Sequence, residues 1–365
     1  GFRCSKDVQG RPARRDRRLS LKIEERMIAK KHVGAAITPR PTNQGICGPS
    51  EMFECWGRWC NGTESRALGR GRCNADHLAV YELVGLVAPF SDGDGRALAT
   101  IHPARPELGA IGDWVGDVSL LHAAEDWLRA QGCQSVRGPM EMCRWFNYRA
   151  NLGPFDELPF AFEPTHHADR WLAAGYSVCS KYVSLLAEHG PQIKAGRDRA
   201  AGLAVSGWTI EPLGTHRHEI SETAFTDMMG LVHEIFTEGF ADVEGYVPVP
   251  ANAILGFYMP HRDKIDLRLT LLARDQSGAP AAFLLAIPDH SQPDRGWFQI
   301  LTLAVLPKHR NGGVGSWLVA AAHQAGQRAG YSAGIHCMIH APRGDDGVHF
   351  SGEIFRRYAL LQKEL

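Results

Sequence analysis

The spacing of apolar residues switches between two periods from about residue 77 onward. Strict alternation over short runs is typical of strands, whereas apolar residues three or four positions apart are typical of helices. In the first half this spacing predicts a hairpin with its turn at Ser91–Gly95, a helix that Asp117 caps and Gly132 ends, and a short helix that Gly175 stops. The predicted strands lie at 77–87, 96–101, 133–136 and 182–186, and the predicted helices lie at 117–132 and 168–174.

The second half has its own succession of elements, beginning near Trp208. Phe225, Met228, Val232 and Ile235 recur at helical spacing and predict an amphipathic helix. Further strands are predicted at 208–213, 267–273, 281–287, 297–306, 332–339 and 358–362, with a helix at 315–329. The order is strand, helix, antiparallel strands and then strand–helix–strand, which predicts an α+β fold with a central mixed sheet flanked by helices.

The length of 365 residues favours two domains rather than one. The polar stretch 191–206 follows a Gly-Pro pair and is typical of a linker. It separates a first domain at 71–190 from a second domain at 207–365. Residues 1–70 form a basic, cysteine-containing segment that precedes both.

Composition and charge narrow the class of partner. Apolar residues make up 44% and charged residues 22%, as in ordinary globular proteins, and no apolar run approaches the roughly 20 residues of a membrane span. Lys plus Arg equals Asp plus Glu at 40 each, so no net field favours nucleic acid or an anionic membrane. Residues 1–40 are rich in Arg and lack the apolar stretch of a secretion signal. They predict a flexible basic arm, a nucleic-acid contact or a targeting segment.

The nine cysteines show no repeated spacing and no Cys-x-x-Cys pair, so we expect no bound metal. Four of them lie singly among apolar residues, as reduced thiols of a cytoplasmic protein do. These four are Cys133, Cys143, Cys179 and Cys337. Cys47, Cys55, Cys60 and Cys73 lie closer together near the start of the chain.

The most informative stretch is an apolar strand, 301–306, that runs into Arg-x-x-Gly-x-Gly at 310–315, where a helix begins at once. Glycines let the backbone approach a ligand, and the free amides and dipole of a helix start attract an anion such as a diphosphate. Lys308, His309 and Arg310 add positive charge. The stretch matches neither a dinucleotide-binding Gly-x-Gly-x-x-Gly motif nor a Walker loop.

This strand, loop and helix together resemble the acetyl-CoA loop of the GCN5-related N-acetyltransferases (GNAT), over roughly residues 208–365. The resemblance implies that loop amides bind the pyrophosphate of the cosubstrate and that the preceding strand pairs with its pantetheine arm. The residues expected to bind acetyl-CoA, or another acyl-CoA, are Leu303, Ala304, Val305, Arg310, Asn311, Gly312, Gly313, Val314, Gly315 and Ser316.

The first half resembles a second, degenerate copy of the same domain. Residues 171–176, followed by the strand at 182–186, are similar to the closing helix, turn and strand of the family. The stretch 127–132 before one strand also parallels 327–331 before another. No Arg-x-x-Gly-x-Gly loop occurs between residues 77 and 190, so we expect this copy to shape the substrate cleft or support the fold rather than bind coenzyme.

Acetyl transfer to an amine needs a base for the amine proton, and an acid can protonate the departing thiolate. The family often uses a glutamate on the strand before the loop, where this chain offers only Gln299 and Thr302. His336 lies on the next strand, with Met338 and His340 predicted on the same face, and it is either the base or a hydrogen-bonded sheet histidine. Tyr358 corresponds to the tyrosine acid of the family, or is a strand residue.

The acceptor site is predicted after the first helix of the second domain. There Glu238, Asp242 and Tyr246 occupy the region where the family binds its acceptor, and they are candidates for holding a cationic amine; the alternative is a solvated polar face. Cys337 is predicted to be a core thiol rather than a nucleophile.

The resemblance implies a cytoplasmic tandem-domain enzyme that transfers an acyl group, acetyl by preference, from CoA to the amine of a small molecule by direct attack in a ternary complex. Two alternatives remain open at this point. One is transfer of longer acyl or aminoacyl groups from a carrier, and the other is a noncatalytic CoA-binding protein, which the missing carboxylate allows.

Overall fold

We describe the fold from a computed structural model, which covers residues 81–365 apart from 154–158, 162, 216–219, 244–245 and 343–349. The predicted segment 1–70 and the first residues of the predicted strand 77–87 lie outside the described residues. The same holds for Cys47, Cys55, Cys60 and Cys73.

In the N-terminal half, strands that follow each other in sequence also lie side by side. The elements are β1 (Leu86–Asp92), β2 (Gly95–Ile101), β3 (Leu108–Val115), α4 (Val118–Gln131), β4 (Ser135–Gly138), β5 (Ala150–Asn151) and α5 (Ala168–Ala173). β1, β2 and β3 pair antiparallel, and β3 pairs in parallel with β4 because α4 joins them as a crossover. Asp117 caps α4 by accepting a hydrogen bond from the Ser119 amide, and Gly132 ends the helix with φ 97°, as predicted.

The C-terminal half has the same plan. Its elements are β7 (Thr209–Pro212), α7 (Glu222–Phe240), α8 (Ala251–Tyr258), η1 (Met259–Lys264), β8 (Leu271–Arg274), β9 (Pro280–Pro288), η2 (Pro293–Arg295), β10 (Trp297–Val305), η3 (Pro307–His309), α9 (Val314–Arg328) and β11 (Ala333–His340). β7 to β10 pair antiparallel in sequence order, and α9 is the crossover between the parallel strands β10 and β11. The fold is therefore α+β with a mixed sheet flanked by helices, as predicted.

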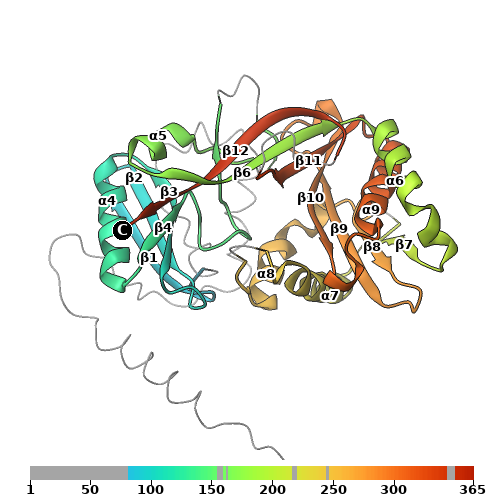
Figure 1. Cartoon of the computed structure of the whole chain (residues 1–365), viewed down its shortest axis with the longest axis horizontal. Helices are drawn as coiled ribbons and strands as arrows, with labels where there is room; N and C mark the ends of the chain where they lie inside the picture. Colours follow the sequence, from blue (N-terminus) through green and yellow to red (C-terminus); the bar gives the residue numbers. More distant parts are fainter. Residues whose placement is uncertain (1–80, 154–158, 162, 216–219, 244–245, 343–349) are drawn as a thin grey trace, which may run out of the picture. The chain divides into compact units, whose positions relative to one another are not determined.

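Two long strands join the halves into one sheet by exchanging places (Figure 1). They are β6 (Ser177–Ala187), which follows the first half in sequence, and β12 (Glu353–Glu364), which ends the chain. β6 pairs with β11 of the second half, β12 pairs with β4 of the first, and the two pair with each other. The strand order is β1-β2-β3-β4-β12-β6-β11-β10-β9-β8-β7. Each half thus takes an inner strand from the other.

The segment predicted as a linker is helical rather than irregular. All of this segment except Ser206 belongs to α6 (His189–Val205), which packs against α9 (Figure 1). Pro191 lies in the first turn, where a helix tolerates proline, and Gly196 permits a close approach because a Cβ there would lie 2.2 Å from Ala320 Cβ. The helix carries no broad apolar stripe, and its contact through a small residue left no periodic signal in the sequence.

Three further elements differ from those predicted from the spacing of apolar residues. Tyr81 and Glu82 are helical and β1 begins only at Leu86, so the strand predicted at 77–87 was misplaced. β3 was not predicted. It contains two glycines, and most of its residues are buried, so apolar and polar residues do not alternate along it. α8 was missed because eight residues are too few to establish a helical period.

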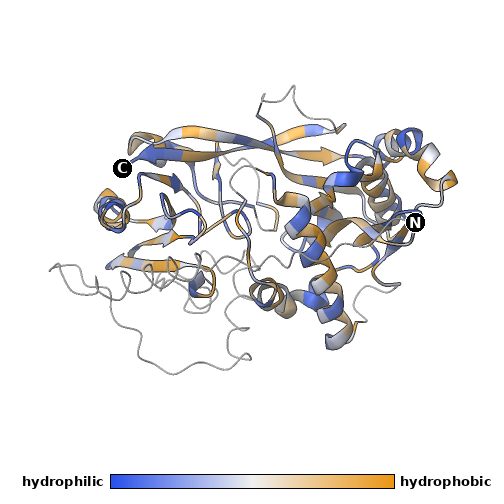
Figure 2. Cartoon of the chain, turned by 60° about the horizontal axis from the view of Figure 1, so that its bottom comes forward, coloured by the Kyte–Doolittle hydropathy of each residue, from blue (hydrophilic) through white to orange (hydrophobic). Residues whose placement is uncertain are grey.

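The hydrophobic core continues across the two halves. Phe225, Val232 and Ile235 of α7 are buried, as their spacing predicted, in a cluster that also contains Met142 and Phe146 of the first half. Along the paired strands β6 and β12, hydrophobic and hydrophilic residues alternate in bands (Figure 2). No helix in the described part of the chain is long and apolar enough to cross a bilayer.

Candidate functional site

A cavity opens where the parallel strands β10 and β11 separate. The strands pair only from Trp297 to Ile300 on β10, and after Ile300 β10 has a bulge. Beyond this point β10 pairs with β9 on one side, and its other edge faces the space toward β11. The cavity has a volume of about 770 Å³. Thr302 and Leu303 of β10 line it, as do His336, Cys337 and Met338 of β11.

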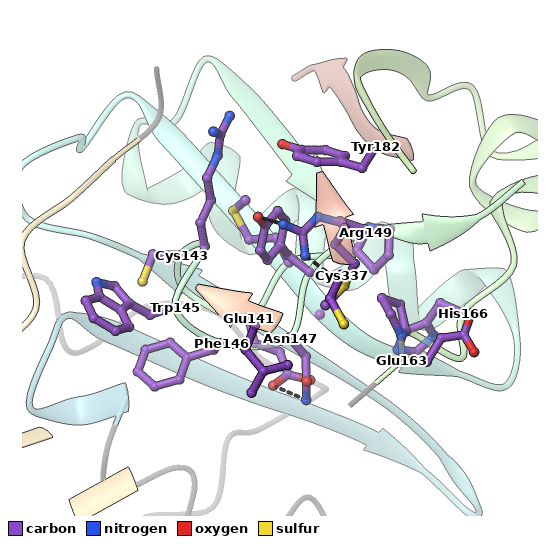
Figure 3. A pocket seen from close by; sticks show the side chains of 18 of the residues that line it. Glu141, Cys143, Trp145, Phe146, Asn147, Arg149, Glu163, His166, Tyr182 and Cys337 are labelled. Atoms are coloured by element: carbon purple, nitrogen blue, oxygen red, sulfur yellow. Dashed lines mark hydrogen bonds between the residues drawn. The ribbon is translucent and has the colours of Figure 1, made fainter. Parts of the chain in front are cut away.

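The first half of the chain supplies the opposite wall (Figure 3). The loop between β4 and β5 contributes Glu141, Asn147 and Arg149, and the segment before α5 contributes Glu163. Tyr182 comes from the exchanged strand β6. The cavity is thus built from both halves, although sequence reasoning assigned named site residues only to the second.

The start of α9 leaves its amides without a side-chain cap. Gly313 is the N-cap residue, with φ 87°, and the first turn contains no acidic residue. Left-handed backbone is costly for residues with a Cβ, and a Cβ at Gly313 would also lie 3.0 Å from the Arg199 carbonyl oxygen of α6. An uncapped helix start with glycine at the turn suits an anion.

Arg310 fixes the loop to α7 rather than facing a ligand. Its guanidinium donates to both carboxylate oxygens of Asp242, at 2.5 and 2.9 Å, and to the Gly239 carbonyl at 2.5 Å. This pairing lowers the pKa of Asp242. A cation at the helix start is Arg199 of α6, whose Nη1 donates to Ser316 Oγ at 3.0 Å. α6 therefore brings positive charge to the loop.

Three buried histidines form a row behind β11. His189 Nε2 lies 2.9 Å from the Tyr331 carbonyl, His189 Nδ1 lies 3.1 Å from His323 Nδ1, and His323 Nε2 lies 2.8 Å from His336 Nε2. Burial lowers the pKa of His323 to about 2 and that of His336 to about 4, so both rings are neutral at pH 7.

Because a carbonyl only accepts, one proton on each ring leaves a single consistent arrangement of the hydrogen bonds. His189 donates from Nε2 to Tyr331 and accepts at Nδ1 from His323. His323 then accepts at Nε2 from His336 Nε2–H. The Nδ1 atom of His336 is left with a lone pair, and His336 lines the cavity.

Two carboxyl groups on the wall hold internal partners. Glu141 accepts from the Tyr81 hydroxyl at 2.6 Å and from Asn147 at 3.2 Å, and its burial raises its pKa to about 7. Glu163 accepts from Arg356 and from the Tyr358 hydroxyl, both at 2.9 Å, and burial raises its pKa. Glu141 is therefore partly protonated at neutral pH.

Residues 233–343 match the family model of the Acetyltransferase (GNAT) family, a range that runs from α7 through β10, the loop and α9 to β11. The chain carries a GNAT acyltransferase domain. The resemblance of the Arg-x-x-Gly-x-Gly segment is thereby confirmed for this part of the sequence. No curated protein matches the chain.

The chain is similar to solved structures along most of its length. The GCN5-related N-acetyltransferase from Sphaerobacter thermophilus is 14% identical, with a TM-score of 0.44, and the match covers 87% of this chain and 94% of that protein. A tandem GNAT protein from the clavulanic acid biosynthesis pathway is 12% identical, with a TM-score of 0.45 and coverage of 90% and 98%. L-PGS from Bacillus licheniformis is 14% identical, with a TM-score of 0.41 and coverage of 91% and 94%.

The first half has the strand–helix–strand plan of the GNAT domain. However, the start of its helix and the gap between its parallel strands are both occupied by the protein's own residues. The carboxylate of Asp117 caps α4, where an anionic ligand would meet a negative charge. β3 and β4 separate after Ala110, and the Met140 amide then bonds the Ile111 carbonyl at 2.9 Å. A Cβ at Gly112 would lie 2.4 Å from Glu141 Cγ, so this space is packed.

The structure brings some predicted site residues of the GNAT domain together and separates others. Thr302, Leu303, His336 and Tyr246 line the cavity, and Ala304 and Val305 continue β10 toward the loop at 310–316. Glu238 is exposed on α7, and Asp242 is paired with Arg310. Tyr358 is fully buried on β12 and is not among the cavity residues.

The predicted common face of His336, Met338 and His340 is interrupted by an irregularity in β11. The register with β6 shifts between His336 and Ile339, and Met338 has φ 51°. As a result His336 contacts α9 through His323, whereas the Met338 sulfur lies 3.0 Å from Arg149 Nη1. Side chains two positions apart share a face only along an unbroken strand.

Proposed function

We propose that the protein is a CoA-dependent N-acyltransferase that moves an acyl group, acetyl by preference, to the amine of a small molecule by direct attack in a ternary complex. One observation carries this proposal. The free edge of β10 is followed directly by the loop and by the uncapped start of α9. The cavity begins beside that free edge.

The residues present fit acyl-CoA. The amides of Gly313, Val314, Gly315 and Ser316 suit its diphosphate, with Arg199 as the adjacent cation. The edge of β10 at 303–305 can pair with the amides of a pantetheine arm as an added strand would. Acyl-CoA would supply an activated thioester carbonyl at the cavity. Among the described residues no cluster of His, Cys, Asp and Glu is arranged to hold a metal.

We assign the proton-accepting role to His336. In the transfer, a bond forms between the amine nitrogen and the acyl carbon, the carbon–sulfur bond breaks, one proton leaves the nitrogen and one ends on the sulfur. His336 lines the cavity, lies on the strand where the base is predicted, and keeps a lone pair on Nδ1 in the histidine row. His323 holds His336 in this tautomer and is a positioning residue.

The cytoplasm is our proposed location, because Cys133, Cys143 and Cys337 are all free thiols. The thiol of Cys337 is buried and its pKa is raised, so it is poorly suited to act as a nucleophile.

The test is release of free thiol from acetyl-CoA by the full chain, with a panel of small amines as acceptors. We expect turnover that depends on both substrates, and the same assay with longer acyl-CoA donors sets the donor preference. Turnover only with a carrier-bound aminoacyl donor would replace the proposal with aminoacyl transfer. Tight CoA binding without turnover on any donor and acceptor would make the protein a noncatalytic CoA-binding protein.

Gly313→Ala tests the loop, because the new Cβ would meet the Arg199 carbonyl and strain the turn that presents the amides. We expect the Kd for CoA, measured by calorimetry, to rise about tenfold or more. Gly330→Ala is the matched control: it has the same kind of left-handed backbone, φ 89°, but open space around a Cβ. Equal CoA affinity in the two variants would contradict binding by the loop amides.

A further inference from the structure

Arg149 carries a buried guanidinium on the cavity wall. It is 9% exposed, and in the described part of the chain no carboxylate forms an ion pair with it. Its guanidinium carbon lies 3.5 Å from the ring centre of Tyr148 and 4.3 Å from that of Tyr182. A guanidinium packed against two aromatic rings leaves its N–H edge as the part that can bind a ligand.

The donors of Arg149 are only partly used. Nη2 donates to the Tyr148 hydroxyl, and Nη1 points to the sulfur of Met338, a weak acceptor, at 3.0 Å. Nε is buried and has no acceptor among the described residues. Leaving a buried charged donor unmatched is costly, and burial accordingly lowers the pKa of Arg149 to about 9, although the group remains a cation at neutral pH.

Further unmatched donors lie on the same cavity. The Tyr182 hydroxyl and Arg144 Nε are buried, and neither has a hydrogen-bond partner within the described residues. Both residues line the cavity with Arg149, and Figure 3 shows Arg149 close to Tyr182 and Cys337. Several buried donors around one space, with a fixed cation among them, are complementary to an acceptor-rich anion.

We propose that Arg149, with the Tyr182 hydroxyl, binds a carboxylate of the acceptor, so that the acceptor is an amino acid or a similar amino-carboxylate. This inference rests on the proposed acyl transfer for the role of the amine, but the anion site itself does not. Anchoring the carboxylate on the wall from the first half leaves the amine to reach β10 and β11. The first half, which binds no coenzyme in this scheme, becomes the part that selects the acceptor.

A carboxylate fits this site better than a phosphate. The N–H edge of the Arg149 guanidinium and the neighbouring Tyr182 hydroxyl match a planar carboxylate, which a guanidinium binds through two parallel hydrogen bonds. Glu141 shares the cavity, and its ionised fraction at neutral pH would disfavour a dianion more strongly than a zwitterion. A phosphate-bearing amine is therefore the competing ligand in the test.

The main variant is Arg149→Met, which removes the charge and keeps a long apolar side chain. Removal of an unpaired buried cation is expected to raise the melting temperature of the ligand-free protein, so loss of binding would not reflect loss of folding. Tyr182→Phe removes only the hydroxyl. Arg129→Gln, at an exposed position on α4, is the control.

The experiment measures binding by calorimetry and turnover with acetyl-CoA for three matched acceptor sets: free amino acids, their carboxamides, and amino-alkyl phosphates. We expect free amino acids to bind and react best. Arg149→Met should weaken this binding about 100-fold and Tyr182→Phe about tenfold, with the affinity for CoA unchanged. The carboxamides should be insensitive to both substitutions.

Three results would overturn the inference. They are equal affinity for amino acids and carboxamides, a preference for the phosphates, and amino-acid binding that Arg149→Met leaves intact. Binding that depends on Arg149 without turnover of any acceptor would uphold the anion site while removing the proposed acyl transfer, so the two failures are distinguishable.

Discussion

At the scale of single residues, Glu141 and the histidine row show how burial sets protonation inside the cavity. Glu141 has a pKa of about 7 and is therefore partly protonated at pH 7. His336 has a pKa of about 4 and is therefore uncharged at the same pH. Both shifts arise from loss of hydration and disfavour the charged form. The cavity wall therefore carries fewer charges at pH 7 than the number of acidic and basic residues that line it would suggest.

Glu141 makes folding less favourable as the pH rises. The ordinary pKa of a glutamate is 4.5, so between pH 4.5 and 7 the folded protein retains a proton that the unfolded chain has lost. The contribution is thus a loss of stability that develops through this window and is complete above pH 7. Glu141→Gln mimics the protonated form and should be more stable than the parent at pH 8 by on the order of 3 kcal/mol, but not at pH 4.5.

Urea unfolding at the two pH values checks this prediction. Glu82→Gln, at an exposed position, should show no such dependence on pH. A gain from Glu141→Gln that is equal at both values would point to packing rather than ionisation.

His323 tests the histidine row. His323→Leu removes the acceptor for His336 Nε2–H, and we expect kcat to fall at least about tenfold with little change in the KM for acetyl-CoA. His323→Gln, whose amide oxygen can accept the same proton, should restore part of the rate. His122→Gln, exposed on α4, should leave it unchanged. Full activity in His323→Leu would exclude the positioning role.

At the scale of elements, the sequence predicted those parts whose signal is local. The cap at Asp117, the stop at Gly132, the apolar face of α7 and the strand–loop–helix at 297–329 all follow from residues near one another. α6 and Arg149 could not be found in this way. α6 is stabilised by contact with α9, and the role of Arg149 depends on rings and a sulfur from Tyr182 and Met338, far away in sequence.

Two glycines of α6 separate packing from helix propensity. A Cβ at Gly196 would lie 2.6 Å from the Ser316 carbonyl oxygen, whereas the position of a Cβ at Gly202 is open. Gly196→Ala should therefore destabilise the protein by about 1–3 kcal/mol through overpacking, and Gly202→Ala should stabilise it by up to about 1 kcal/mol. Chemical denaturation measures both. If Gly196→Ala were stabilising, α6 would not be packed closely on α9.

At the scale of the whole molecule, the exchanged strands connect the proposed acceptor site to the proposed coenzyme site. β6 carries Tyr182 into the cavity and pairs with β11, while β12 returns to β4. A separated second half would lack the strand that covers β11, and a separated first half would lack the strand beside β4. The exposed edges would favour association with other chains.

This arrangement predicts that the two halves unfold together. Leu361 is fully buried on β12, opposite Gly138 of the first half, and Leu361→Ala should cost about 2–5 kcal/mol. Hydrogen exchange in increasing urea should show the amides of β3 and β10 losing protection at one common midpoint, and the substitution should shift both by the same amount. The reason is that β12 and β6 are shared, so neither sheet half retains its inner strand once the other has opened. Separate midpoints, with only β3 responding to Leu361→Ala, would show instead that the halves are independent folding units that merely exchange a strand.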